Sequence, residues 1–326
     1  MIPLEEIFCF IDDFCKLFDK KSQGYFLESS TKKRKKACQM SLSEIMMIEV
    51  MFHFSHYRTF KDFYNNCVLI SYKAAFPRAV SYTRFLELKQ YALMPLAIFL
   101  TCLQGRKTGI YYTDSTKLTV CDNLRISRNK VFKGFAKRGK TSTGWFFGFK
   151  LHIVFNHLGD IMAFKITPGN IDDRKPVLAL TKNLEGWLFG DRGYISKKLS
   201  ASLRQKGIEM ITKVKKNMKK VLLSPLKKYL LSKRGFVETI IDQLKNILHI
   251  DHSRHRSVVN FQVNVLGAIL SYVFKPKKVS VPFSAMNHQS LSLTSSPLLI
   301  SSERKSSTAC LFELLPQCLF RDPKRN

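Results

Sequence analysis

Two acidic residues directly follow short, mainly apolar runs, and a carboxylate at such a position must be explained. Asp114 follows IYYT in the segment IYYTDST at 110–116, and Asp191 follows GWLFG. Aspartate is disfavoured in strands and costly to bury unpaired, so each acid must cap a turn, meet a cationic partner or bind a metal ion. A turn or an N-cap explains either acid alone, whereas two acids at the ends of two neighbouring strands favour a shared site.

A third acid comes from a helix predicted over residues 234–248. At about 100° per residue, one stripe of this helix carries four charged residues, namely Arg234, Glu238, Asp242 and Lys245. Apolar residues form another stripe. The pattern fits an active-site acid at Glu238, and it fits equally an ordinary amphipathic helix whose charged face meets water.

Three carboxylates around one point repel one another unless divalent cations neutralise them. Mg²⁺ prefers oxygen ligands and shares them readily with substrate phosphates, and Mn²⁺ accepts a similar set. Two such ions stabilise both the attacking and the leaving oxygen of an in-line displacement. An oxygen-only trio in a basic protein therefore predicts two-ion chemistry on a phosphodiester.

The charge of the chain points to a polyanionic partner. It has 54 Lys and Arg against 24 Asp and Glu, a formal net charge of +30. A field of that sign recruits nucleic acid first and an anionic membrane surface second. No stretch approaches the roughly 20 apolar residues of a spanning helix, so no membrane partner is expected. The acidic start MIPLEEIFCFIDDF is unlike a signal peptide, and we expect a cytoplasmic protein with reduced thiols.

The elements that would position these acids change type along the chain. Residues 1–104 are predicted to be helical, with a capping box in SLSE at 41–44 and a further helix from about Ser81 to Leu103. Beyond Gly109 we predict five strands at 110–116, 145–155, 161–167, 186–191 and 208–214, and helices at 171–184, 195–207 and 234–248. Three strands in hairpins followed by βαβα units predict one mixed α/β sheet flanked by helices.

Two further segments carry candidate residues. In KVFKGFAKRGKTSTGW at 130–145, basic residues alternate with aromatic residues. The segment either binds DNA or is a solvated loop whose aromatic side chains pack against the sheet. The DNA-contacting residues predicted there are Lys133, Lys137, Arg138, Lys140 and Trp145. In GNIDDRK, Asp172 and Asp173 either supply a further acid or cap the helix that follows, and the cap is favoured.

These motifs together resemble a known family. The spacing of Arg234, Glu238 and Lys245 resembles the signature around the third acid of DDE transposases from bacterial insertion sequences. YYTDST and GDRGY resemble the segments with that family's first and second acids. KVFKGFAKRGKTSTGWFFGFKLH and TPGNIDDRKPV are similar to the branch called insertion-sequence family 982. The resemblance covers roughly residues 1–277.

The resemblance implies a ribonuclease-H-like core with a five-stranded mixed sheet. It implies that Asp114, Asp191 and Glu238 are the catalytic, metal-binding triad, and that Arg234 and Lys245 lie near the DNA backbone. The implied enzyme cuts double-stranded DNA at the ends of its element and joins the 3′ hydroxyl to target DNA, as a homodimer in the synaptic complex. A structure-specific nuclease with the same core and an inactive DNA-binding remnant are the alternatives.

The predicted organisation has three parts. Residues 1–104 form a helical domain that binds transposon ends, and residues 105–277 form the catalytic domain. Residues 278–326 form a Ser-rich tail without periodicity, which predicts disorder or a run-on reading frame.

Overall fold

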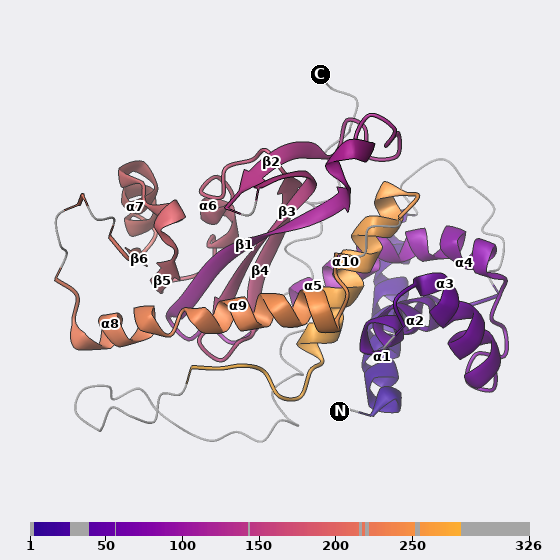
Figure 1. Cartoon of the computed structure of the whole chain (residues 1–326). Coiled ribbons are helices and arrows are strands. Elements are labelled where there is room, and N and C mark those ends of the chain that lie inside the picture. Colours follow the sequence, from indigo (N-terminus) through magenta and orange to yellow (C-terminus); the bar gives the residue numbers. More distant parts are fainter. Residues whose placement is uncertain are drawn as a thin grey trace.

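The computed structural model describes residues 3–26, 39–55, 57–142, 144–214, 217–218, 222–251 and 255–281 (Figure 1). Its α-helices are α1 (Leu4–Phe26), α2 (Leu42–Phe54), α3 (Phe60–Asp62), α4 (Tyr82–Leu88), α5 (Leu93–Cys102), α6 (Val177–Leu180), α7 (Lys197–Arg204), α8 (Pro225–Ser232), α9 (Gly235–Asp242) and α10 (Val258–Val273). Its strands are β1 (Ile110–Cys121), β2 (Lys137–Thr141), β3 (Gly144–Asn156), β4 (Ile161–Pro168), β5 (Gly186–Gly190) and β6 (Ile208–Thr212). Nearly all of the predicted tail, and the basic run at 31–36, lie outside the described residues.

The six strands form one mixed sheet with β1 near its middle. β1 runs antiparallel to β3 and parallel to β5, which in turn runs parallel to β6. β4 and β2 both pair with β3 along its other edge, one after the other. Without β2, the order β4-β3-β1-β5-β6 is that of a ribonuclease-H-like sheet, so the predicted five-stranded fold class is confirmed. β2 is a short additional strand that was not predicted from the sequence.

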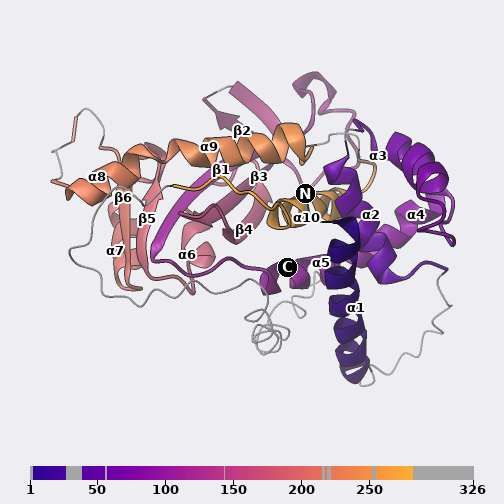
Figure 2. The ribbon, with the colours of Figure 1, turned by 90° about the horizontal axis from the view of Figure 1, so that it is seen from below.

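Helices cover both faces of this sheet. Figure 2 shows α8 and α9 on one side of the strands and α6 and α7 on the other. Successive side chains of β1 point to opposite faces. Tyr112 therefore makes a T-shaped ring contact with Phe236 of α9, with ring centroids 4.8 Å apart. Tyr111 packs on the other face, in the hydrophobic cluster with α6 and α7. Both faces of β1 are buried at this point.

β1 is longer than the strand predicted at 110–116. It continues past Asp114 to Cys121 because β3 is long enough to pair with it over that whole length. Asp114 was predicted at the end of its strand, and it lies instead inside β1. The parallel pairing with β5, however, stops at Tyr112 opposite Phe189. Asp114 consequently stands where β1 has lost one of its two neighbouring strands.

The helices after Gly109 differ from the prediction in three places. The helix predicted over 171–184 is the single turn α6, and its N-cap, Pro176, makes no side-chain cap. Neither α8 nor α10 was predicted as a helix, although twelve of the sixteen residues of α10 are buried. The helix predicted at 195–207 is confirmed as α7, which Ser196 caps.

The first hundred residues are helical as predicted. The capping box is present, because the Ser41 hydroxyl accepts from the Glu44 amide while the Glu44 carboxylate accepts from the Ser41 amide. α10 packs against α2 and α5, and Figure 1 shows it between these helices and the sheet. One hydrophobic cluster runs from Ile7 to Val281. The helical part and the sheet therefore share a core.

The helical run Tyr82–Cys102 is long and apolar enough to cross a membrane by length and composition alone, which differs from the sequence expectation. About 44% of its apolar window is buried inside the protein. Ala92, Leu96 and Leu100 are among its core residues. The apolar character of this run is thus explained in part by packing within the protein.

A buried ion pair joins two helical segments of this part. Lys89 Nζ lies 2.7 Å from Glu49 Oε1, and the two side chains are 2% and 0% exposed. Burial raises the pKa of Glu49, and the Lys89 charge opposes that rise. One turn further along α2, His53 Nδ1 donates to the Leu248 carbonyl over 2.5 Å. The helical part is thus attached directly to the chain that follows α9.

Candidate active site

Asp114 and Asp191 come from neighbouring parallel strands. The last register pair of β1 and β5 is Tyr112 with Phe189, and two further residues along each chain lead to Asp114 and Asp191. Asp191 follows the last residue of β5, keeps an extended backbone and starts the short turn Arg192–Tyr194. Strands in a sheet lie about 4.8 Å apart, so the two acids start from nearly the same place.

Arg234 connects the first acid to the third. Its guanidinium donates to Asp114 Oδ2 over 3.3 Å and to Glu238 Oε1 over 3.1 Å. Glu238 lies in the first turn of α9 and Arg234 just before it, so Arg234 can pair with Glu238 while it reaches Asp114 of β1. The Arg234 side chain is only 16% exposed, whereas that of Glu238 is 67% exposed. The predicted charged stripe therefore faces water at Glu238 but not at Arg234.

The pKa of Asp114 depends on both of the other acids. Burial raises its pKa, and the Arg234 guanidinium and the Ser115 amide oppose that rise. The negative charges of Asp191 and Glu238 raise the pKa of Asp114 further, so both lie close enough to act on it. A mostly buried carboxylate near two others is a group that gains from a nearby cation.

The chemistry of this donor set fits a hard divalent cation. The three side chains offer only carboxylate oxygens, the ligands that Mg²⁺ prefers. Arg234 already places a positive charge between two of them, which shows that the position accepts a cation. Within the described part of the chain, no three His, Cys, Asp or Glu side chains converge closely enough to hold an ion as they stand. Asp114, Asp191 and Glu238 would have to close on a cation, with Arg234 turning aside.

Lys245 lies elsewhere than its helical spacing suggested. α9 ends at Asp242 and continues as a π-helical segment, Gln243–Ile247, which changes the angle between successive side chains. Lys245 Nζ donates to the Lys117 carbonyl over 3.0 Å and lies 3.7 Å from Asp251. Burial lowers its pKa. Its ammonium group is therefore held by β1, and it does not join the three acids.

The basic residues predicted in the segment 130–145 form an exposed surface around β2. Lys133, Lys137, Arg138 and Lys140 are all exposed, and Trp145 is 61% exposed. Lys140 Nζ lies 5.7 Å from the Trp145 ring centre. Phe132 is buried, as the interpretation of a solvated loop expects, whereas Phe135 and Trp145 face outward. This surface, Lys133 to Trp145, is separate from the contacts around Asp114.

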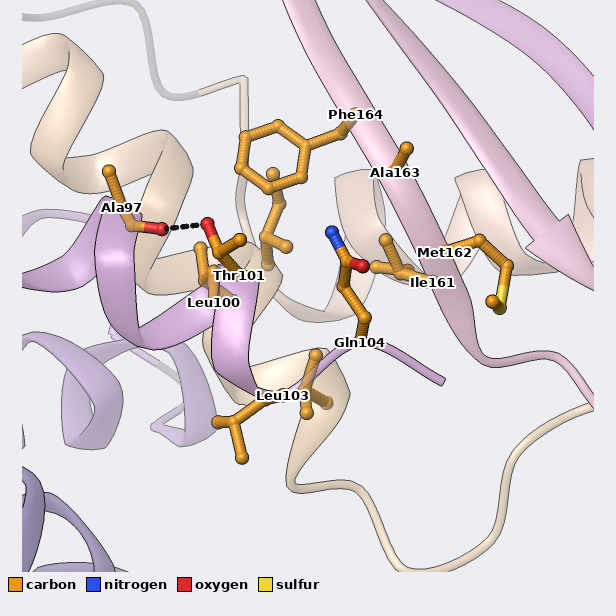
Figure 3. A pocket seen from close by; sticks show the side chains of 11 residues that line it. Ala97, Leu100, Thr101, Leu103, Gln104, Ile161, Met162, Ala163 and Phe164 are labelled. Atoms are coloured by element: carbon orange, nitrogen blue, oxygen red, sulfur yellow. Dashed lines mark hydrogen bonds between the residues drawn. The ribbon is translucent and has the colours of Figure 1, made fainter. Parts of the chain in front are cut away.

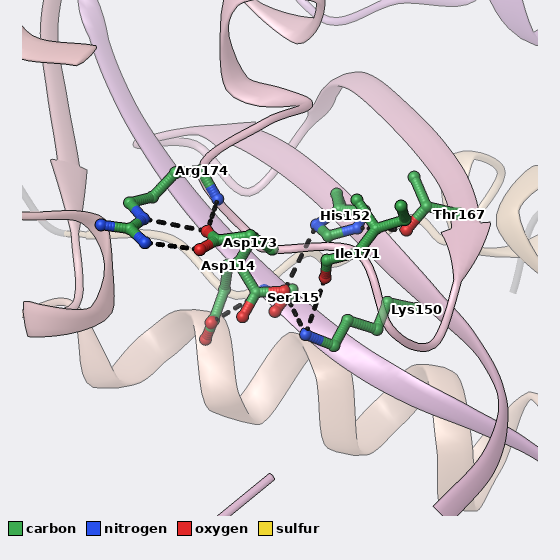
Figure 4. A network of polar contacts seen from close by, with 9 residues as sticks. Asp114, Ser115, Lys150, His152, Thr167, Ile171, Asp173 and Arg174 are labelled. Atoms are coloured by element: carbon green, nitrogen blue, oxygen red, sulfur yellow. Dashed lines mark hydrogen bonds and ion pairs between the residues drawn. The ribbon is translucent and has the colours of Figure 1, made fainter. Parts of the chain in front are cut away.

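The loop after β4 joins the sheet in a way that was not predicted from the sequence (Figure 4). Asp172 accepts from the Arg174 amide and pairs with its guanidinium, so it closes a local turn and caps no helix. Asp173 instead lies 3.0 Å from Lys150 Nζ of β3. The predicted N-cap is thus wrong for both acids. No local signal shows that a lysine 23 residues earlier is the partner of Asp173.

A cavity of about 220 Å³ lies apart from these groups (Figure 3). α5, β4 and α10 line it, largely with apolar side chains such as Leu100, Phe164 and Ile269. None of the candidate site residues contributes to its wall. It therefore takes no part in the chemistry of the three acids.

The strand order and the helices on both faces of the sheet are those of a ribonuclease-H-like fold. Residues 104–258 match the family model described as Transposase DDE domain, so this part of the chain is similar to that domain. Among curated proteins no relative matches the chain.

Three solved structures are similar at low identity. The intasome of simian T-cell lymphotropic virus with the PP2A regulatory subunit B56 gamma shares 12% identity over 67% of this chain and 74% of that one, at a TM-score of 0.29. The Mos1 transposase paired-end complex with the left transposon end shares 11% over 78% and 85%, at a TM-score of 0.22. A pre-cleavage Mos1 transpososome shares 11% over 79% and 85%, at 0.21. At these TM-scores the likenesses carry no argument, and the strand order and the family match of residues 104–258 stand without them.

Proposed function

We propose that the chain is the transposase of a bacterial insertion sequence, related to family 982, which cleaves DNA at the ends of its element and joins the 3′ hydroxyl to target DNA. The observation that carries this proposal is that Arg234 bridges Asp114 of β1 and Glu238 of α9, while the charges of Asp191 and Glu238 both act on the pKa of Asp114. The family match of residues 104–258 supports it.

The roles of the acids follow from their positions. Asp114, Asp191 and Glu238 would hold Mg²⁺ or Mn²⁺, which when bound supplies positive charge to the attacking and leaving oxygens of the phosphodiester. Asp114 is fixed by β1 and by its Ser115 hydrogen bond, so it is the rigid member. Glu238 is exposed and paired with Arg234, and it would close towards Asp114 once Arg234 turns aside. Arg234 then turns its guanidinium to the scissile phosphate, for which a planar, doubly donating cation is suited.

Basic residues away from the three acids would hold the DNA. The exposed Lys and Arg side chains around β2 would contact phosphates. The outward-facing Phe135 and Trp145 offer surfaces on which nucleobases stack. Lys245, held by the Lys117 carbonyl, would support β1 next to the site and not bind the DNA backbone itself. Two element ends must be brought together before joining, so we propose that two copies of the chain act on them.

The test is cleavage of a labelled element end in Mg²⁺ by the full chain. Asp114→Asn, Asp191→Asn and Glu238→Gln each remove one charge at constant volume, and each should abolish cleavage while leaving binding to the end nearly unchanged. Asp242→Asn is the matched control, because Asp242 lies on the same helix, is exposed and contacts Asn246. Near-full cleavage by any of the three variants removes that residue from the proposal.

Joining separates this function from the alternatives. A transposase gives strand-transfer products from a pre-cut end, and a structure-specific nuclease with the same core gives only hydrolysis. A DNA-binding remnant would bind the end and give neither product.

A further inference from the structure

Residues 122–140 and Trp145 form a basic arm at one end of the sheet, near the top of Figure 1. The arm includes the surface Lys133 to Trp145 and three further exposed basic residues, Arg125, Arg128 and Lys130. Asp122 is its only acidic residue. No acidic side chain of the described residues forms an ion pair with a basic residue of the arm. The arm therefore presents uncompensated positive charge, which attracts a polyanion.

Large apolar side chains lie exposed between these charges. Leu124 is 93% exposed and Phe135 is 58% exposed, and the Trp145 ring is exposed as well. Exposed apolar groups that gather on one segment mark a binding surface. Protein–protein interfaces are depleted in lysine, whereas grooves that bind nucleic acid combine basic with aromatic residues. The composition of the arm therefore fits nucleic acid better than a protein partner.

The arm is anchored to the protein at Phe132. This side chain is buried and makes T-shaped ring contacts with Phe149 of β3 and Phe261 of α10, at centroid distances of 6.0 and 5.6 Å. Two residues later Gly134 adopts a φ of +89°, and the Phe135 amide donates to the Phe132 carbonyl over 3.1 Å. Because of this turn, Phe135 faces outward while Phe132 is buried. The exposed ring of Phe135 is thus held in place before any ligand binds.

Trp145 and Lys140 form a second fixed pair. They are register partners on β3 and β2, and Lys140 Nζ lies 5.7 Å from the centre of the Trp145 ring. The Asn123 side chain donates to the Trp145 carbonyl over 3.0 Å and so attaches the start of the arm to β3. A flat ring beside an ammonium group can stack on a nucleobase while the ammonium group contacts a neighbouring phosphate.

The exposed rings indicate which form of nucleic acid the arm binds. In a duplex the faces of the nucleobases are stacked on one another, and only their edges are accessible in the grooves. An aromatic side chain can stack only on a nucleobase that is unpaired and exposed. Single-stranded DNA offers such nucleobases along its whole length, together with the phosphates that the basic residues attract.

The sheet register places Trp145 on the same face of the sheet as Asp114. Asp114 pairs with Ile153 of β3, and Trp145 lies eight residues earlier on that strand. Directly paired residues share a face, and so do residues an even number apart on one strand. At about 3.4 Å per residue, Trp145 and Ile153 are about 27 Å apart along β3. A DNA strand that leaves the acids can therefore reach the arm within several nucleotides.

We propose that the basic arm binds single-stranded DNA next to the cleavage point, with Trp145 and Phe135 stacking on unpaired nucleobases and the basic residues holding the phosphates. This proposal rests on the proposed function and names the form of DNA that this surface takes. The competing explanation is that the arm contacts only the phosphates of duplex DNA. In that case its aromatic rings contribute nothing to binding.

The experiment is titration of the full chain carrying Trp187→Phe with a single-stranded DNA of about twelve nucleotides and with the duplex of the same sequence. The chain has two tryptophans, so Trp145 is then the only one, and its fluorescence reports stacking directly. Single-stranded DNA should quench this fluorescence, and the duplex should bind through its phosphates with little quenching. Equal quenching by both, or quenching by neither, overturns the proposal.

The affinity of the chain with Trp187 intact is measured by the anisotropy of the same two DNAs carrying a fluorescent label. Trp145→Ala should weaken binding of the single strand by about tenfold and leave binding of the duplex nearly unchanged. Leu222→Ala is the matched control, because Leu222 is fully exposed and follows a basic run in the sequence but has no ring. It should bind both DNAs like the parent. An equal loss for both DNAs in Trp145→Ala, or no loss for either, overturns the proposal.

Two further measurements exclude structural explanations. The Trp145 ring is exposed, so Trp145→Ala should keep the melting temperature of the parent. If this variant does not fold, Phe135→Ala replaces it. Weaker binding of the single strand alone then supports the proposal, and unchanged binding overturns it. If Trp145→Ala dissociates a dimer of the DNA-free chain in sedimentation, the arm is an interface between two copies, and the proposal is overturned as well.

Asp114→Asn separates this proposal from the proposed function. This variant should cleave no DNA but keep the preference for the single strand, because Asp114 lies outside the arm. If the parent prefers the single strand but does not cleave element ends, only the proposed function is wrong. If the parent cleaves element ends and shows no such preference, only the assignment of the arm is wrong.

Discussion

Arg234 occupies the place between two acids where the proposed function needs a cation, so removing its charge should destabilise the protein only when no cation is present. The informative variant is Arg234→Met, which keeps most of the aliphatic stem and removes the guanidinium. At 3.3 Å and an effective dielectric constant of about 20, the attraction to Asp114 is about 5 kcal/mol before desolvation is subtracted. A hydrogen bond to a charged, mostly buried group contributes about 1.5–3 kcal/mol net. The Glu238 pair, with that carboxylate 67% exposed, adds less than about 1 kcal/mol.

The expected loss is therefore about 3 kcal/mol in the free energy of unfolding, measured by urea denaturation without divalent cations. A cation at about 100 times its dissociation constant stabilises a binding site by about 2.7 kcal/mol. In saturating Mg²⁺ the variant should recover most of its loss, because the ion replaces the missing charge and no longer competes with Arg234.

Arg174→Met is the matched control. It breaks a surface pair with Asp172 whose side chains are 44% and 39% exposed, so it should cost less than about 1 kcal/mol with or without Mg²⁺. An equal loss for Arg234→Met in both conditions would refute the reasoning, since it would mean that the guanidinium and the cation occupy different places.

Two further predictions concern buried charges. Lys89→Met leaves the fully buried Glu49 without its partner and should cost about 3–5 kcal/mol in urea denaturation, whereas Lys89→Met with Glu49→Met should recover most of this loss. A double variant as unstable as the single one would contradict the importance of the pair. Because burial raises the pKa of Asp114 above 3.8, Mn²⁺ binding should be lost on acidification at a higher pH than an ordinary aspartate would give, and at a higher pH still in Arg234→Met. Without a cation, the free energy of unfolding due to Asp114 should fall as the pH rises through this range. Calorimetry between about pH 4 and 7 measures the first effect, and an unshifted midpoint would count against it.

The sequence was sufficient for those parts of the fold that depend on local pattern. The five core strands are rich in apolar residues, and Ser41 and Ser196 precede helices that they cap. The end of β1 was predicted wrongly because polar residues after Asp114 look unlike a strand by themselves. They form one because β3 pairs with them as far as Cys121. Pairing between distant segments thus overrode the local preference of these residues.

In the candidate site too, features with a local sequence signal were predicted, and features that depend on distant contacts were not. Asp191 follows its strand as predicted, since an acid after a short apolar run and before a turn is a local signal. The surroundings of Arg234 were not predictable, because the spacing of a helix places charges on a face without telling what that face meets. The contact of Lys245 with the Lys117 carbonyl was not predictable, because the π-helical segment after Asp242 changes the helical repeat. Neither effect has a signature in the residues of the helix alone.

α10 is the last described helix of the chain, and it fills the space between the N-terminal helices and the sheet. Its Ser271 hydroxyl donates to the Val50 carbonyl, and its Tyr272 hydroxyl donates to the Gly159 carbonyl. A ribosome makes α2, α5 and the sheet first, so their apolar faces stay uncovered until residues 258–273 have been synthesised. A stop codon or frameshift before this helix would therefore yield a chain without a completed core, and such a product should aggregate or be degraded instead of competing with the full-length protein for DNA.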